Sequence, residues 1–134
     1  MNIFVSSQSV DGARAASLIE RLRLAKVTIE HSPRNPIDGD DPRWRGWYEV
    51  GLPAAVERCK LFVAVIDPGW ESSTWMACEA EVATKKGRPL CYWNPDGVKV
   101  AAGGMVPYLR EELPPSINEA VEQLLRAGGA QPAP

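Results

Sequence analysis

The residues of this sequence best suited to chemistry are carboxylates around one predicted helix. Glu79 and Glu81 lie within this helix, and Glu71 precedes it. Glu79 follows Trp75 by four residues, so the two side chains share one face of the helix. A carboxylate beside an indole can hydrogen-bond the hydroxyl pair of a ribose and stabilise an oxocarbenium-like centre as a glycosidic bond opens. If the leaving group is a cation such as nicotinamide, no acid has to protonate it, and one carboxylate suffices.

The same residues also allow a purely structural interpretation. A glutamate on a helix is usually solvated, and Trp75 is equally suited to anchoring the helix in the core. Glu81 fits a plain surface charge better than Glu79 does. The catalytic interpretation therefore requires that Glu79 face a cavity rather than bulk water.

The sequence lacks the residues that several other kinds of functional site require. Neither GxGxxG nor GxxxxGK[ST] occurs, so both of these phosphate-binding loops are absent. His31 is the only histidine, and it lies in a proline-rich stretch, which argues against a Ser-His-Asp triad. The three cysteines (Cys59, Cys78 and Cys91) show no CxxC spacing and fit free thiols in a reducing cytoplasm. We expect neither a metal nor a cofactor.

The elements that position Glu79 alternate between strand and helix. A continuous apolar run such as 61–66 belongs in the middle of a parallel sheet. The pattern predicts an α/β fold, a flavodoxin-like doubly wound parallel sheet of about five strands with helices on both faces. The expected strands cover 3–5, 27–30, 61–66 and 89–93, with a short edge strand at 98–100 or 106–109; the expected helices cover 11–25, 47–59 and 75–86, and the last helix follows Ser116.

Ligands of doubly wound sheets bind beyond the carboxyl ends of the strands. Segments 6–11, 31–45 and 67–75 are expected at that edge. The 31–45 loop carries three prolines and three aspartates, and a loop of this length in a small domain is more often functional than not. We expect Trp44 to lie near the ligand, where an indole can stack on a base, and Trp47 to pack a helix against the loop.

Composition limits the class of protein. The 134 residues include 15 basic and 17 acidic side chains, a net charge of −2, which argues against direct nucleic-acid binding. We expect one domain over 1–128 and a flexible tail over 129–134. No apolar run approaches the roughly 20 residues of a membrane span, and the N-terminus lacks the features of a signal peptide. We therefore expect a cytoplasmic protein without a membrane partner.

Three stretches resemble the Toll/interleukin-1 receptor (TIR) domain family in its bacterial form. Residues 3–11, IFVSSQSVD, match the family's first strand and the polar residues and aspartate that follow it. Residues 56–66 match the end of a helix and the family's third strand. Residues 73–79, STWMACE, match the family's serine, tryptophan and glutamate, with Met76 where a cysteine is usual. The resemblance covers about residues 1–93.

This resemblance implies an enzyme that hydrolyses or cyclises NAD⁺ and releases nicotinamide, in bacterial anti-phage defence or signalling. It implies that Glu79 is the catalytic carboxylate, that Trp75 is a stacking wall, and that Ser6 and Ser7 line the pocket. The 31–45 loop corresponds to the family's BB loop, which gates the pocket and mediates self-association. A separate sensor or effector protein is a further expected partner.

Two other hypotheses remain open. Nucleoside 2-deoxyribosyltransferases share the fold and the glutamate, and they also cleave an N-glycosidic bond. Their Gly-Thr before the glutamate is matched only in part by Ser73-Thr74, whereas Trp75 fits the TIR pattern better. Asp67, directly after the third strand, would suit substrate binding in either family. The remaining hypothesis is a TIR module that has lost catalysis and signals by assembly.

Overall fold

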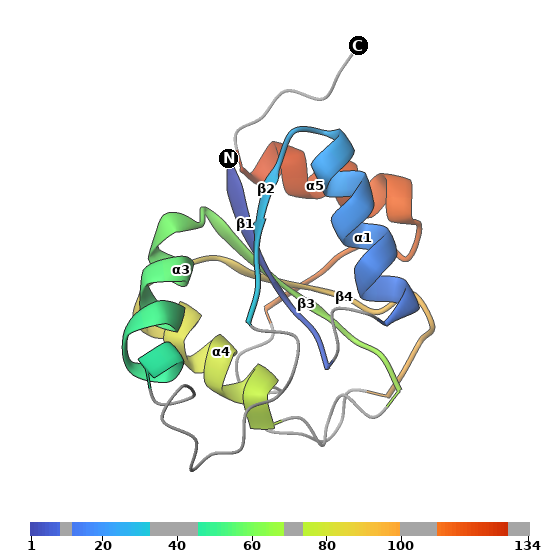
Figure 1. Cartoon of the computed structure of the whole chain (residues 1–134). Coiled ribbons are helices and arrows are strands. Elements are labelled where there is room, and N and C mark those ends of the chain that lie inside the picture. The colour runs from blue at the N-terminus through green and yellow to red at the C-terminus, as the bar shows by residue number, and fades with distance from the viewer. Residues whose placement is uncertain (9–11, 33–45, 69–73, 100–109, 129–134) are drawn as a thin grey trace.

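The core of the protein is a five-stranded sheet whose strands are all parallel, in the order β2-β1-β3-β4-β5 (Figure 1). The computed structural model describes residues 1–8, 12–32, 46–68, 74–99 and 110–128. The strands are β1 (Asn2–Ser6), β2 (Thr28–Glu30), β3 (Leu61–Val65), β4 (Leu90–Trp93) and β5 (Glu111–Glu112). This strand order is that of flavodoxin-like folds, so the predicted fold class is confirmed.

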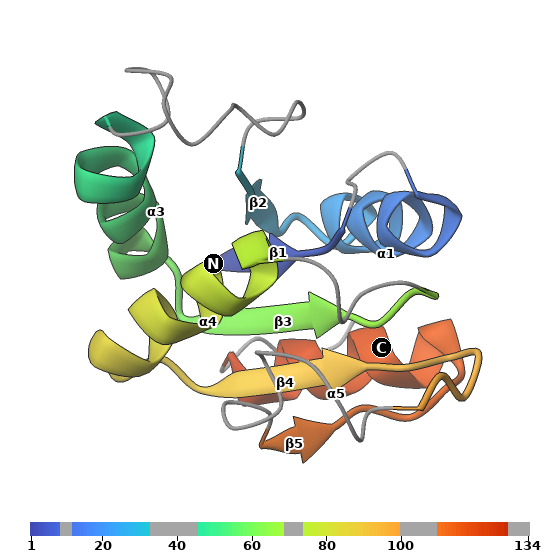
Figure 2. The same ribbon diagram turned by 90° about the horizontal axis from the view of Figure 1, so that it is seen from below.

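Helices cover both faces of the sheet, with α1 and α5 on one side and α3 and α4 on the other (Figures 1 and 2). The helical elements are α1 (Ala13–Leu24), η1 (Trp47–Gly51), α3 (Leu52–Arg58), α4 (Thr74–Lys85) and α5 (Ile117–Ala127). None of the helices in the described ranges combines the length and apolar character that a membrane crossing requires. The predicted tail, 129–134, lies outside those ranges.

Strand alternation divides the core into two clusters. In β1, Ile3 and Val5 pack with α1 and α5, whereas Phe4 packs with α3 and α4. The rings of Phe4 and Phe62 stack on this second face, with their centroids 5.4 Å apart. Because side chains alternate along a strand, Ser6 points to the same face as Phe4. The last residue of β1 therefore presents its hydroxyl to the side covered by α3 and α4.

The edge strand differs from its prediction. Residues 98 and 99 are not in a strand, and 106–109 lies outside the described residues. The observed edge strand is β5, where Glu111 pairs with Cys91 of β4. Both residues of β5 are exposed. An exposed two-residue strand has no apolar alternation to reveal it, which is why the prediction at 98–100 was wrong.

The helical region predicted at 47–59 begins with one π-helical segment, η1, and continues as α3. Pro53 falls in the first turn of α3, where the missing N–H costs no helical hydrogen bond. Gly51 ends η1, and a Cβ at this position would lie 2.5 Å from Cε3 of Trp47. The glycine therefore leaves the space in which the Trp47 indole lies.

Candidate active site

Glu79 is buried, and both of its carboxylate oxygens accept a hydrogen bond from a serine. Its side chain is 3% exposed, and Ser6 and Glu79 are the buried polar or charged residues found in the described ranges. Ser6 Oγ donates to Oε1 at 2.8 Å. Ser32 Oγ donates to Oε2 at 2.5 Å. The structure thus brings together Glu79 and Ser6, two residues that the sequence placed at one edge of the sheet.

Three elements position these groups. Ser6 ends β1, and Ser32 follows the neighbouring strand β2 by two residues, so the carboxyl ends of adjacent parallel strands bring the two hydroxyls together. Met76 and Ala80 are fully buried and fix α4 against the sheet. Glu79 lies on the same side of α4, three residues after Met76 and one before Ala80, and so points toward the ends of β1 and β2.

Burial sets the protonation state of Glu79. Desolvation raises its pKa from 4.5 to about 7, although the hydrogen bonds from Ser32 and Ser6 favour the charged form and lower it. Within the described residues, no charged side chain contributes to this shift. A buried carboxylate without a countercharge is a site that a cationic ligand group would stabilise.

Ser32 and Trp47 belong to this site, and the sequence did not assign either to it. Trp47 Nε1 donates a hydrogen bond to Ser32 Oγ at 3.1 Å. Trp47 also packs against the cluster beneath α3 and α4, whereas its predicted packing against the 31–45 loop falls mostly outside the described residues. The position of Ser32 just beyond the end of a strand was the available signal, but a single serine in a 15-residue loop does not stand out.

Ser7 and Asp67, two other predicted site residues, also lie in the described part of the chain. Ser7 Oγ is buried and has no hydrogen-bond partner within the described part of the chain. Burial and Asp96 raise the pKa of Asp67, and Arg14 lowers it; Glu79 is not among the described groups that shift it. The side chain of Trp75, the whole of Trp44 and most of the 31–45 loop lie outside the described residues, so their roles stay predictions.

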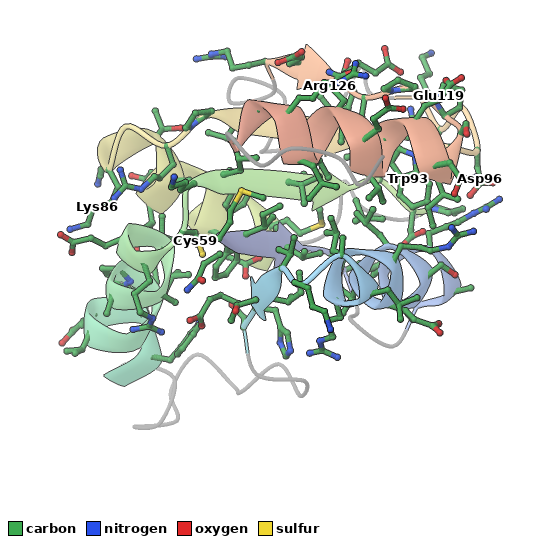
Figure 3. The ribbon with its side chains drawn as sticks, turned by 90° about the horizontal axis from the view of Figure 1, so that it is seen from above. Cys59, Lys86, Trp93, Asp96, Glu119 and Arg126 are labelled. Carbon is green, nitrogen blue, oxygen red and sulfur yellow. The ribbon has the colours of Figure 1, made fainter. Side chains whose placement is uncertain are left out.

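A second polar cluster lies on the other face of the sheet. Arg14 of α1 binds Asp96 with two hydrogen bonds, from Nη2 to Oδ1 at 2.5 Å and from Nε to Oδ2 at 3.0 Å. Asp96 and Trp93 lie at the opposite end of the molecule from Cys59 and Lys86 (Figure 3).

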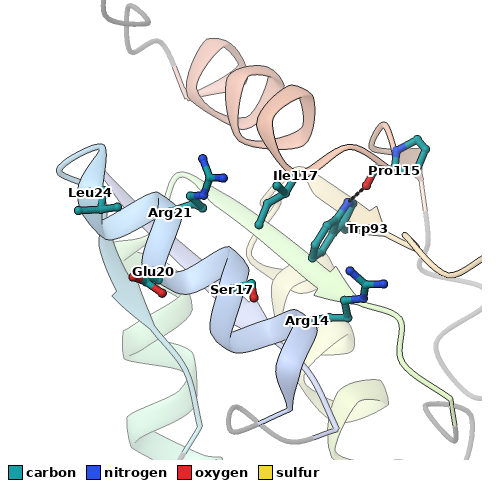
Figure 4. Close-up of a pocket in the computed structure, with 8 residues that line it drawn as sticks. All are labelled: Arg14, Ser17, Glu20, Arg21, Leu24, Trp93, Pro115 and Ile117. Carbon is teal, nitrogen blue, oxygen red and sulfur yellow. Dashed lines mark hydrogen bonds between the residues drawn. The ribbon is translucent and has the colours of Figure 1, made fainter.

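Arg14 also lines a groove of about 340 Å³ between α1 and α5, with Trp93 on its floor (Figure 4). This groove is separated by the sheet from Glu79. In the described ranges, no group of three or more His, Cys, Asp or Glu side chains could hold a metal ion.

Comparison with known proteins places the fold but no family. No protein-family model and no curated protein sequence matches the chain. A 2-deoxyribosyltransferase from Bacillus psychrosaccharolyticus matches in structure with a TM-score of 0.67 and 15% identity, over 99% of both chains. The TIR domains of the activated Roq1 resistosome, which recognises the pathogen effector XopQ, match with a TM-score of 0.50 and 14% identity, over 97% of this chain and 84% of theirs. At these identities the similarity shows a shared fold.

Proposed function

We propose that the protein cleaves the bond between nicotinamide and ribose in NAD⁺, with Glu79 as the catalytic carboxylate. The observation that carries the proposal is the burial of Glu79 with hydroxyl donors on both oxygens and no countercharge among the described residues. The nicotinamide ring of NAD⁺ is a cation attached to the sugar carbon that reacts. Binding it beside Glu79 supplies the missing positive charge and lowers the pKa of the carboxyl.

The chemistry requires one carboxylate. As the glycosidic bond breaks, its electron pair moves to the ring nitrogen, so nicotinamide leaves as a neutral molecule without a proton. Ionised Glu79 stabilises the positive charge that develops on the ribose. Each carboxylate oxygen keeps one further lone pair beyond its serine bond, which ribose hydroxyls can use. Water then attacks to give linear ADP-ribose, or an adenine nitrogen of the same molecule attacks to give the cyclic product; in both cases one proton is released to solvent.

The second candidate is transfer of a 2-deoxyribosyl group between bases. It is favoured by the match to the 2-deoxyribosyltransferase, which covers 99% of both chains at a TM-score of 0.67. In that reaction Glu79 would attack the deoxyribose, and the departing neutral base would need a proton. Nicotinamide needs no such proton when it leaves NAD⁺, so one carboxylate suffices for that reaction, and we place NAD⁺ first.

The biological setting belongs to the same proposal. We place the activity in anti-phage defence or signalling, with self-association through the 31–45 loop and a separate sensor or effector as partner. A catalytically silent interaction module is the hypothesis to be excluded. Such a module would assemble with increasing concentration but release no nicotinamide.

A direct assay separates these functions. Wild-type protein, Glu79→Gln and the control Glu81→Gln are mixed with NAD⁺ over a series of protein concentrations, and released nicotinamide is measured. Glu81 is on the same helix but lies in an exposed ion pair with Lys85, so its loss tests for nonspecific damage. We expect turnover by wild type and Glu81→Gln only. Base exchange with a deoxynucleoside and a free base, without NAD⁺ consumption, would instead establish the second candidate.

A further inference from the structure

A chain of hydrogen bonds runs from an indole through a hydroxyl to the candidate catalytic carboxylate. Trp47 Nε1 lies 3.1 Å from Ser32 Oγ, which lies 2.5 Å from Glu79 Oε2. The three residues come from η1, from the segment after β2 and from α4, so the chain joins elements that are far apart in sequence. Ser6 approaches the other carboxylate oxygen independently of this chain.

The chemistry of the groups fixes the direction of these bonds. An indole nitrogen can only donate, so the Ser32 hydroxyl must be the acceptor in its bond with Trp47. A hydroxyl has a single proton, and the ionised Glu79 carboxylate can only accept. The indole therefore occupies a lone pair of Ser32 and leaves its proton directed at Glu79.

The Trp47 ring is itself held by the backbone of its own helical element. A Cβ on Gly51 would meet three ring carbons of Trp47, the nearest at 2.5 Å, so the indole lies directly on the glycine. The side chain also packs against the cluster formed by α3 and α4. The orientation of the indole N–H is thus set by packing rather than by solvent.

We propose that Ser32 is a positioning residue for Glu79, and that Trp47, seated on Gly51, holds the Ser32 hydroxyl in its donating orientation. The proposal rests on the proposed function for its catalytic consequence, but not for the hydrogen bonds themselves. By favouring the ionised carboxylate, Ser32 opposes the effect of burial on the pKa of Glu79. The relay then decides how much of the enzyme carries the reactive form near neutral pH.

Few titratable groups surround this relay in the described ranges. β1 and β3 carry none, and Glu30 of β2 is paired with Arg58 of α3. His31, beside Ser32, has Nδ1 at 2.8 Å from the Ser32 carbonyl oxygen. Glu49 lies on η1, and Cys78 precedes Glu79 on α4; burial, Glu81 and Glu79 raise the pKa of the Cys78 thiol. None of these side chains contributes to the pKa of Glu79, so a change in that pKa reports on the two serines.

The test measures the pKa of Glu79 without any need for turnover. The carboxyl carbon of Glu79 is titrated by ¹³C NMR in the full chain as wild type, Ser32→Ala, Trp47→Phe and the control Trp93→Phe. Trp93 is a buried tryptophan whose indole N–H donates to the backbone carbonyl of Pro115 at 3.2 Å, so this control removes an indole donor from the other cluster. Gly51→Ala provides a variant that displaces the Trp47 ring without altering any donor.

We expect Ser32→Ala to raise the pKa of Glu79 by about one pH unit, since a hydrogen bond to a charged group is lost. Trp47→Phe and Gly51→Ala should raise it by less, and Trp93→Phe should leave it unchanged. If wild type releases nicotinamide, the acid limb of its pH profile should move to higher pH in the same order. A pKa that is unchanged in Ser32→Ala, or equally shifted in Trp47→Phe and Trp93→Phe, overturns the relay. Shifted pKa values without turnover in wild type overturn the NAD⁺ proposal alone.

Discussion

Glu79 of α4 and Asp96, which is bound to Arg14 of α1, are associated with helices on opposite faces of the same sheet. They differ in how their negative charges are stabilised. Asp96 has a side chain that is 35% exposed and a two-pronged contact with Arg14. Glu79 is almost wholly buried and receives only serine hydroxyls from the described residues. Asp96 has its countercharge in Arg14, whereas no described residue supplies a positive charge to Glu79. The comparison shows that a buried carboxylate without a countercharge among the described residues, rather than the number of polar contacts, identifies the candidate site.

The largest expected effect is on nicotinamide release, which should depend on Glu79 and not on Asp96. Glu79→Gln should lower nicotinamide release by about 10³-fold or more, because the neutral amide cannot stabilise the developing cation. Asp96→Asn should change it less than twofold, since Asp96 is bound to Arg14 of α1, which covers the face of the sheet opposite α4. Initial rates at saturating NAD⁺ check both variants. Equal losses in the two would remove the basis of the comparison.

The next effect concerns stability and pH. The pKa of Glu79 is about 7 in the folded protein against 4.5 for the free carboxyl, so the folded state holds its proton more tightly. Stability therefore falls as pH rises from 4.5 to 7, by about 3 kcal/mol in total, and stays low above that range. We expect Glu79→Gln to raise the free energy of unfolding at pH 8 and to leave it unchanged at pH 4. Urea titrations at both pH values measure this, and a variant less stable at pH 8 would contradict it.

A smaller effect is expected at Ser6. Ser6→Ala removes the donor to Oε1 and leaves the Ser32 bond in place, so the pKa of Glu79 should rise. At pH 7 the ionised fraction should fall several-fold, and activity with it, while raising the pH should recover most of the loss. Rates across pH 6 to 9 provide the measurement. A loss that higher pH does not recover would assign Ser6 a role in binding rather than in ionisation.

The smallest effect sharpens the other side of the comparison. Arg14→Ala should lower the free energy of unfolding only slightly, because both partners of its ion pair are substantially exposed. Salt should reduce even this difference, since exposed pairs are screened. Urea unfolding at low and high salt tests the point. A large and salt-independent loss would show that the Arg14–Asp96 pair is a structural element of the α1–α5 face.

The features that could be predicted from the sequence were those with a regular pattern of residues, such as an apolar run or helical spacing. The continuous apolar run of β3 identified a central parallel strand, and the spacing of Glu79 on its helix placed it at the carboxyl edge. Ser32 follows a three-residue strand that is partly exposed and offers no periodicity, so its contact with Glu79 could not be read in advance. Asp67 follows β3 closely, as predicted, and the described charged groups that shift its pKa are Asp96 and Arg14. Which face a loop residue serves depends on packing that no local pattern encodes.

The close approach of Trp47 to the α-carbon of Gly51 offers a criterion for sorting homologous sequences. A glycine four positions after this tryptophan is compatible with the observed ring position, whereas alanine or any larger residue there would push the ring aside. Homologues that keep the glutamate and lose this Trp-x-x-x-Gly spacing would be expected to operate at a more alkaline optimum. If the proposed function holds, inspecting this one five-residue segment in a set of sequences would sort them by working pH before any of the proteins is purified.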